Sequence, residues 1–199
     1  MGINYAKLNY MKEATSIKGI HTFRAYDMSS KHAQLIDWSI KNWINVKRFV
    51  PQKLHRTGYE FLKKNLQKFQ TREMIVENLI TTVGRSVIAQ RLANITTYTG
   101  IINYGALGSS STAVANGDTQ LGTEVFRKVV ASSSYTTNVA FIDFFYSKAD
   151  TNGTYNEFGT FIDGTASANT GQMFTHALTG GWVKTSSESM TVSTQYTIS

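Results

Sequence analysis

The sequence contains no cysteine and a single proline, Pro51, among its 199 residues. Without cysteine, disulfide bonds and thiolate metal sites are excluded, so packing, hydrogen bonds and contacts with partner subunits are expected to hold the fold together. Charged residues are also scarce, at 17% of the chain, which is low for a soluble monomer. A low charged share is typical of long-lived assemblies, in which neighbouring subunits cover the surface.

Long apolar runs are missing as well. No stretch approaches the roughly 18 apolar residues that span a bilayer, and residues 1–7 lack the apolar core of a secretory signal. The sequence therefore predicts a protein made in the cytoplasm, with no membrane among its partners.

The net charge of +7 is distributed unevenly. Residues 1–95 hold 16 basic and 6 acidic residues, or +10, whereas residues 96–199 hold 4 and 7, or −3. Two parts of opposite sign indicate two units: a basic N-terminal attachment region over 1–95, containing a hairpin and two helices, and an assembly domain over 96–199.

Two stretches near the start of the chain show the alternation of side chains that is typical of β-strands. Residues 17–26 and 35–41 both show a period of two around a polar break, which favours a β-hairpin. A helix over residues 32–46 is the competing interpretation.

Two helices are expected next. Thr57 and Glu60 match a capping box, in which each side chain satisfies a backbone N–H group, and apolar residues then recur at helical spacing up to Phe69. A second helix is predicted from about Ile75 to Leu92, with Thr71 as a possible cap and Gly84 marking a close helix contact.

The amino-acid composition changes beyond Asn94, where Thr, Ser, Gly and Asn dominate. Six strands are predicted at 100–107, 123–132, 139–147, 157–162, 171–178 and 189–198. Turn residues separate these strands, with Gly180-Gly181 among the predicted turns. Short strands without helices between them indicate an antiparallel sandwich, so the fold class is α+β, with a hairpin and helices followed by an all-β sandwich.

The predicted strand that contains Glu124 sets a testable register. Alternation places Val125 and Arg127 on one face and Glu124 and Phe126 on the other, with Phe126 in the core. Arg127 is then free to pair with a carboxylate such as Glu157.

No constellation of residues indicates catalysis. The four histidines, including His176, lack partners at ligand spacing, and the carboxylates Asp143, Glu157 and Asp163 are better explained by turns and ion pairs than by a metal site. No phosphate-binding loop or nucleophile motif occurs. The sequence predicts a protein that is not an enzyme, with no cofactor and no metal.

Two sets of residues are candidates for contacts. A basic surface is predicted from Lys47, Arg48, Lys53, Arg56, Lys63, Lys64 and Lys68. It fits a solvated face or an acidic neighbour better than nucleic acid, because no aromatic-plus-basic recognition motif accompanies it. Trp182, Tyr135 and Tyr155 lie near predicted loops, where they could form an assembly or receptor contact or pack at a subunit interface.

A series of segments in the second part of the chain follows a familiar order. It runs through Val76–Arg85 (VENLITTVGR), Ile102–Gly108 (INYGALG) and Thr119–Lys128 (TQLGTEVFRK), and continues through Glu157–Gly164, Gly171–Phe174 and Trp182–Thr185. This series resembles structural proteins of tailed bacteriophages. In those proteins a helix leads to a strand, a variable loop and a second strand carrying Leu-Gly-Thr-Glu. The resemblance covers about residues 74–199 and leaves residues 1–70 outside.

The resemblance implies a virion component and brings no catalytic residues with it. The expected function is a structural tail, baseplate or fibre-attachment protein that forms homo-oligomers and binds other virion proteins. A capsid decoration protein and a receptor- or glycan-binding module remain open as alternatives.

Overall fold

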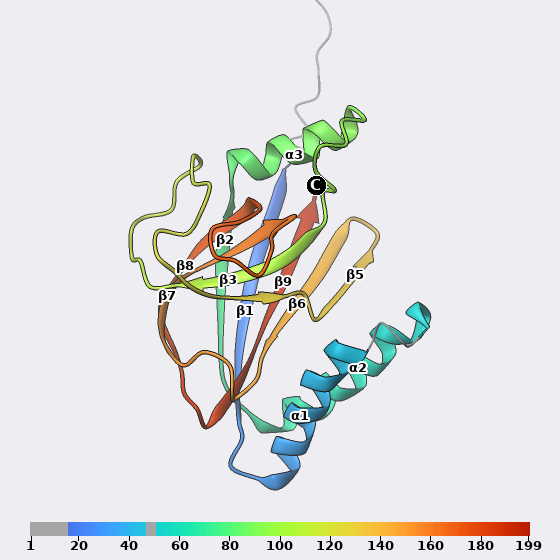
Figure 1. The fold of residues 1–199 in the computed structure, drawn as a ribbon, viewed down its shortest axis with the longest axis vertical. Coiled ribbons are helices and arrows are strands. Elements are labelled where there is room, and N and C mark those ends of the chain that lie inside the picture. Colours follow the sequence, from blue (N-terminus) through green and yellow to red (C-terminus); the bar gives the residue numbers. More distant parts are fainter. Residues whose placement is uncertain (1–15, 47–50) are drawn as a thin grey trace, which may run out of the picture.

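The computed structural model describes residues 16–46 and 51–199. Over these residues it combines three α-helices with one curled antiparallel sheet of nine strands (Figure 1). The helices are α1 (Lys31–Val46), α2 (Gln52–Leu66) and α3 (Thr82–Leu92), with a 3-10 turn, η2 (Gln67–Phe69), after α2. The strands are β1 (Ile17–Asp27), β2 (Gln70–Ile80), β3 (Ile102–Gly108), β4 (Glu124–Val129), β5 (Ser132–Thr136), β6 (Val139–Tyr146), β7 (Gly153–Ile162), β8 (Gln172–Lys184) and β9 (Glu188–Ile198).

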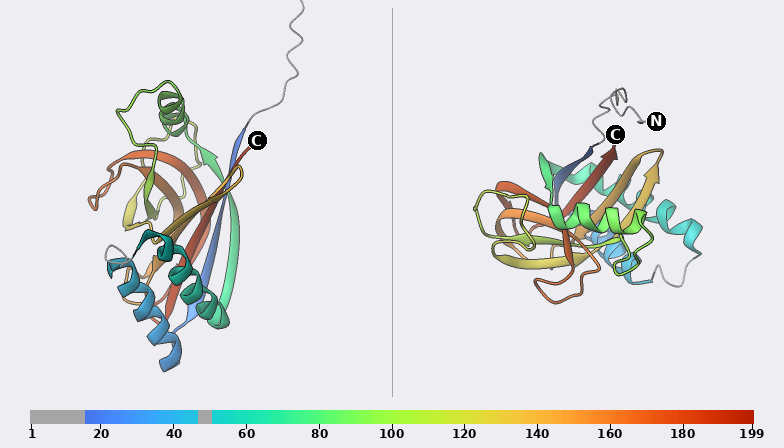
Figure 2. Two further views of the ribbon diagram at one scale, coloured as in Figure 1. Left: turned by 90° about the vertical axis from the view of Figure 1, so that its right-hand side faces the viewer. Right: turned by 90° about the horizontal axis from the view of Figure 1, so that it is seen from above.

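The α+β class is confirmed, but the two-sheet sandwich is wrong. The strands follow the order β4-β3-β7-β8-β2-β1-β9-β6-β5, so β2 and β1 lie between β8 and β9. β1 pairs with β9 along its whole length, from Ile17 opposite Ile198 to Asp27 opposite Glu188. Strands from both sides of residue 95 therefore share one sheet, which curls into a half-barrel (Figure 2).

The predicted N-terminal hairpin is also wrong in its second arm. Residues 17–26 form β1 as expected, but residues 35–41 lie within α1, as the competing interpretation had it. Ala33, Ile36 and Ile40 recur at helical spacing and are buried against α2, which contributes Tyr59 and Leu66. Packing of this apolar stripe outweighs the local alternation.

The second predicted helix divides into a strand and a shorter helix. Residues 75–80 belong to β2, and α3 begins only at Thr82, where Thr81 caps it by accepting a hydrogen bond from the backbone N–H of Gly84. Thr71 therefore lies in β2 and does not cap a helix. Gly84 does mark a close contact, but with Phe174 of β8 and not with another helix. α2 likewise begins at Gln52 after Pro51, so Thr57 lies inside this helix.

Gly180 and Gly181 were expected to form a turn, but both lie within β8, with φ angles of 62° and 88°. They sit at a shift in the pairing of β7 with β8, between Tyr155 and Glu157. Glycine adopts these positive φ angles without the steric cost that other residues meet, so the strand continues through an irregularity.

The two edge strands of the sheet, β4 and β5, are connected directly through Val130 and Ala131. The backbone N–H of Val130 donates to the backbone oxygen of Asn103 in β3, and that of Ala131 donates to the backbone oxygen of Asp143 in β6. The chain therefore leaves one edge of the sheet and enters the other within two residues. This crossing brings β4 close to β6, and Phe126 and Tyr146 are in ring contact across the gap.

Three clusters of buried side chains stabilise the sheet. The largest fills the inside of the curl and includes Phe23, Phe144, Phe158 and Trp182. On the opposite face, α1 and α2 pack beside β5 and β6 around Tyr59 and Phe145 (Figure 2). The third cluster lies on the outer face of β3, β7 and β8, where Leu121 from the segment 109–123 covers Phe161 and Met173.

Candidate functional site

The three aromatic residues proposed as contacts do not meet on one surface. Tyr155 and Trp182 lie opposite each other on β7 and β8 and are buried in the inner core. The indole N–H of Trp182 donates to the sulfur of Met190 at 3.0 Å. Tyr135 is 78% exposed on β5, which is an edge strand of the sheet. Only Tyr135 is therefore placed to contact a partner.

The proposed basic surface is divided in the structure. Lys47 and Arg48 lie outside the described residues, as does the side chain of Lys53. Arg56, Lys64 and Lys68 are exposed on or next to α2. Lys63 instead turns toward the sheet, and its ammonium group lies 3.0 and 2.9 Å from the two carboxylate oxygens of Asp143. Lys63 thus fixes α2 to β6, which removes it from any exposed basic patch.

His176 is not isolated, contrary to the expectation from sequence. Its Nδ1 lies 2.7 Å from Asp118 and its Nε2 lies 3.0 Å from Glu157, and both His176 and Glu157 are buried. The Glu157 carboxylate also accepts backbone N–H groups from Ser110, Gly122 and Thr123. This arrangement anchors the segment 109–123 to the outer face of the sheet, and it leaves Glu157 no contact with Arg127.

Arg127 pairs with Glu124 on its own strand. The pairing of β4 with β3 skips Val125, because Phe126 lies opposite Leu107 and Glu124 opposite Gly108. This bulge turns Glu124 to the side of Arg127, so that the two make a bidentate ion pair at 2.6 and 2.7 Å. The predicted alternation across Val125 is therefore wrong, whereas Phe126 does pack against the inner core.

A polar cluster is buried inside the curl. The hydroxyl of Tyr196 lies 2.9 Å from that of Thr160 and 3.3 Å from that of Thr175, and His21 Nε2 lies 3.3 Å from Thr175 and 3.1 Å from Asn78. Burial lowers the pKa of His21 from 6.5 to about 3 and raises the pKa of Tyr196 above its usual value of 10.0. Both side chains are thus neutral at pH 7 and contribute no charge to a site.

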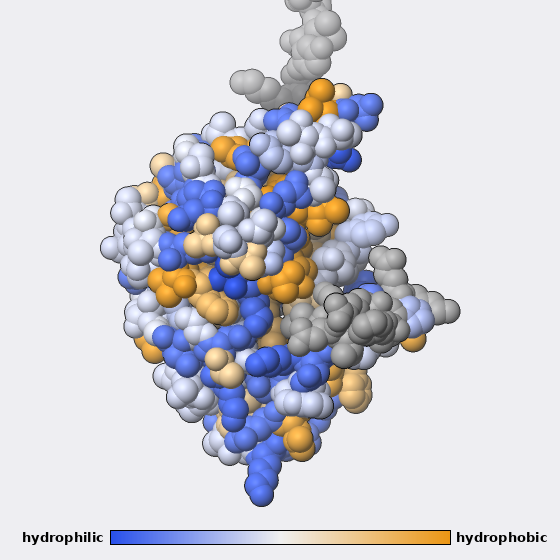
Figure 3. All heavy atoms as spheres, viewed as in Figure 1, coloured by the Kyte–Doolittle hydropathy of each residue, from blue (hydrophilic) through white to orange (hydrophobic). Residues whose placement is uncertain are grey.

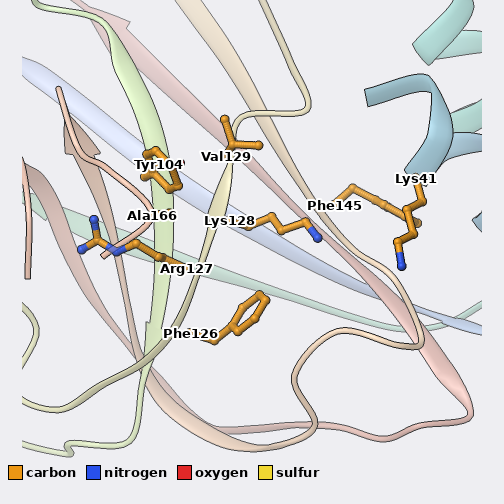
Figure 4. Close-up of a pocket in the computed structure, with 8 residues that line it drawn as sticks. All are labelled: Lys41, Tyr104, Phe126, Arg127, Lys128, Val129, Phe145 and Ala166. Atoms are coloured by element: carbon orange, nitrogen blue, oxygen red, sulfur yellow. The ribbon is translucent and has the colours of Figure 1, made fainter. Parts of the chain in front are cut away.

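The crossing at Val130 and Ala131 leaves a gap on each side. The first gap, between β4 and β6, holds a pocket of about 290 Å³ lined by Lys41, Tyr104, Phe126, Arg127, Lys128, Val129, Phe145 and Ala166. Figure 4 shows Lys128 pointing toward Phe145, while Arg127 points to the opposite side of β4. The ammonium group of Lys128 is bound to Asp150 at 2.7 Å, so its charge is already paired.

The second gap opens into an apolar cleft at the end of the sheet beside α3. This end cleft has a volume of about 410 Å³ and is lined by Ile17, Ile88, Gly100, Ile101, Ile102, Ser133, Ser134, Tyr135, Ala140, Ile142, Phe174, Tyr196 and Ile198. At its mouth Ile101 is 65% exposed and Ile198 is 54% exposed. Figure 3 shows hydrophobic side chains gathered on the surface below α3. The end cleft therefore joins the inner core to the surface.

A polar groove lies on the opposite face of the sheet, against α2. It has a volume of about 380 Å³, and its floor consists of side chains from neighbouring strands in register. Thr22, Ser193, Asp143 and Ser132 form one row, and Ile20, Gln195, Phe141 and Ser134 form the next. Arg56 and Glu60 of α2 line the wall. The groove offers hydroxyl, amide and charged groups around one partly exposed aromatic ring.

Comparison of the chain with models of protein families, with curated proteins and with solved structures finds no match. In the part of the chain that the structure describes, no group of three or more His, Asp or Glu side chains is arranged to hold a metal ion. No described helix is long and apolar enough to cross a membrane.

Sequence reasoning missed the end cleft because its lining comes from segments far apart in the chain. Ile17, Ile101 and Ile198 lie at or just before the ends of their strands, and nothing in their local pattern distinguishes them from core residues. Ile17 and Ile198 are brought together by the pairing of β1 with β9. The start of one alternating run at Ile17 and the end of another at Ile198 are the local signals that these two residues lie at the end of a sheet.

Proposed function

We propose that this protein is a structural subunit of a tailed-bacteriophage particle, and that it binds copies of itself or other virion proteins through the end cleft. The observation that carries the proposal is the exposure of Ile101, Tyr135 and Ile198 around an open apolar cleft. Exposed apolar surface of this kind marks an interaction site, because leaving it in water costs about 25 cal/mol for each Å².

The edge of the sheet supports the same proposal. β5 is the last strand in the sheet order, and it borders the end cleft through Ser133, Ser134 and Tyr135. An edge strand has unpaired backbone N–H and C=O groups on its outer side, and these groups can pair with an extended segment from a partner. Hydrogen bonds along β5 and burial in the cleft can thus act together in one contact.

The placement in a phage particle depends on the resemblance of residues 74–199 to tailed-phage structural proteins. The quoted segments fall on connected parts of the fold, because Ile102–Gly108 is β3 and Glu124 to Lys128 lies in its neighbour β4. Within this class we favour a tail, baseplate or fibre-attachment component over a capsid decoration protein. Immunogold labelling of particles distinguishes the two, since gold on the capsid shell would identify a decoration protein.

The proposal is tested by sedimentation velocity over a range of concentrations. We expect the unmodified protein to form oligomers of defined size and to join particles assembled without it. Ile101→Asp should weaken self-association at least tenfold, because a charge in the cleft mouth must be desolvated on binding. Leu35→Asp is the matched control, since Leu35 is 66% exposed on α1, away from the cleft. A protein that stays monomeric at all concentrations and never joins particles would overturn the proposal.

A second candidate function is binding of a saccharide in the polar groove. The rows of Ser, Thr, Gln and Asp side chains offer donors and acceptors for sugar hydroxyls, and Phe141, 37% exposed, offers an apolar face. Arg56 is exposed at the wall and can bind a carboxylate. A glycan array should then show binding that Arg56→Ala and Gln195→Ala weaken and that Ile101→Asp leaves unchanged.

A further inference from the structure

β1 begins at the rim of the end cleft. Ile17 is one of the lining residues, and Ser16 continues the pairing with the last strand through two hydrogen bonds to Ser199, at 2.6 and 2.9 Å. The chain that precedes Ser16 therefore joins the described structure at the same end of the sheet where the apolar side chains are exposed.

The segment before β1, residues 1–15, is itself rich in apolar side chains. Eight of its 15 residues are apolar or aromatic, a larger share than the 41% of the whole chain, and they are Met1, Ile3, Tyr5, Ala6, Leu8, Tyr10, Met11 and Ala14. Solvated segments are usually poor in such residues, because nothing covers them. The sequence therefore provides an apolar segment and the fold provides an apolar cleft.

We infer that residues 1–15 of a second copy occupy the end cleft, an inference that rests on the proposed assembly function. The direction of the chain favours a second copy over the same copy. β1 runs from the rim of the cleft into the sheet, so the chain before Ser16 can enter the cleft of its own copy only by reversing the direction of β1. Such a reversal needs a tight turn, and residues 10–15 (YMKEAT) contain none of the Gly, Pro, Asn, Asp and Ser residues that dominate tight turns.

The reach of the segment is sufficient for this contact. Fifteen residues in extended conformation span about 50 Å, which exceeds the distance across a small domain. In the cleft the segment can pair with the open edge of β5 while its apolar side chains contact Ile101 and Tyr135. A contact of segment to cleft joins unlike surfaces, so each copy offers one segment and one cleft, and copies associate head to tail until the ring closes at a defined size.

Two full-length variants test the inference by complementation. In the first variant, Ile3→Asp with Leu8→Asp disables the segment and leaves the cleft intact. In the second, Ile101→Asp disables the cleft and leaves the segment intact. We expect each variant alone to be monomeric at concentrations where the unmodified protein forms larger assemblies. A 1:1 mixture should form a heterodimer and nothing larger, because only one functional segment and one functional cleft remain in the pair.

Controls separate this contact from a general loss of structure. Far-ultraviolet circular dichroism should show the same spectrum for both variants and the unmodified protein. The control variant Lys12→Asp with Leu35→Asp also introduces two carboxylates, one in the segment and one on α1. It replaces no apolar residue of the segment and should leave assembly unchanged. A fluorescent peptide of residues 1–15 should bind the segment variant and bind the Ile101→Asp variant at least tenfold more weakly.

The outcomes separate this inference from the proposed function. If the segment variant assembles like the unmodified protein while Ile101→Asp does not, the cleft binds another partner: the inference is overturned and the assembly function stands. If the unmodified protein remains monomeric and joins no particle, both are overturned. A mixture of the variants that stays monomeric, with both variants folded and each monomeric alone, also rules out exchange of the segment.

Discussion

Glu157 is the side chain on which the outer segment 109–123 depends most. It is 1% exposed and accepts hydrogen bonds from three backbone N–H groups as well as facing His176. Glu157→Ala should lower the free energy of unfolding by about 3–5 kcal/mol, because buried donors lose their acceptor and His176 loses a partner. Urea denaturation measures the effect. Glu77→Ala, on an exposed part of β2, should change stability by less than about 0.5 kcal/mol.

His21 should make stability depend on pH. Its pKa is about 3 in the folded protein because of burial, against 6.5 for the exposed side chain. Between these values the unfolded chain binds a proton that the folded protein does not, so stability is present above pH 6.5 and falls as the pH falls. From pH 7 to pH 5 this contribution loses about 2 kcal/mol.

Denaturation of His21→Phe at the same two pH values isolates this effect. The variant cannot bind the proton, so its free energy of unfolding should fall by about 2 kcal/mol less than that of the unmodified protein over this range. The comparison is between the changes in free energy of unfolding from pH 7 to pH 5. A loss of stability from repacking beside Phe158 is the same at both pH values and therefore cancels. Parallel pH profiles would mean that His21 titrates normally in the folded protein.

Some contacts of single residues could not be predicted from the sequence. The partners of His176 are 58 and 19 residues away in the chain, and no spacing rule connects them. The pairing of Arg127 with Glu124 depended on a bulge that skips Val125, and an alternating pattern does not reveal such a bulge. The inward position of Phe126 was predictable, because it depends on an apolar side chain alone.

At the scale of elements, α3 is held against β8 by a glycine. A Cβ atom at Gly84 would lie 2.8 Å from the backbone oxygen of Phe174 and 2.8 Å from its ring. Gly84→Ala should therefore destabilise the protein by about 1–3 kcal/mol. The same change in an exposed helix would stabilise it by about 0.5–1 kcal/mol. Ser86→Ala on the exposed side of α3 is the control, and a gain in stability for Gly84→Ala would show that α3 can move away from β8.

The elements themselves were predictable where one pattern dominated. Residues 188–198 alternate cleanly and form β9, and residues 139–146 form β6. Residues 75–80 fit both periods, because Ile75, Val76, Leu79 and Ile80 suit a helix as well as a half-buried strand. The choice between these structures is made by β1, which pairs with β2 from Gly19 to Tyr26, and no local pattern contains that information.

At the scale of the whole molecule, the central strands tie both parts of the chain into one unit. β9 has β1 as a neighbour over eleven residue pairs, and β8 has β2. The fragment 96–199 should therefore fail to fold alone, because it lacks the two strands that stand between β8 and β9. Near-ultraviolet circular dichroism should show no fixed aromatic environment in the fragment and one cooperative transition in the full chain. A cooperative transition in the fragment would mean that it forms a sheet of its own.

The pairing of β1 with β9 also means that one edge of β1 stays unpaired during most of translation. β1 and β2 have both been made once residue 80 emerges, but the other edge of β1 stays uncovered until residues 188–198 appear. At about 5–20 residues per second, this interval is on the order of ten seconds. Throughout it the nascent chain carries an open strand edge, which can pair with a second nascent chain. The order of the strands thus creates a period during which a chaperone has a defined target on the ribosome.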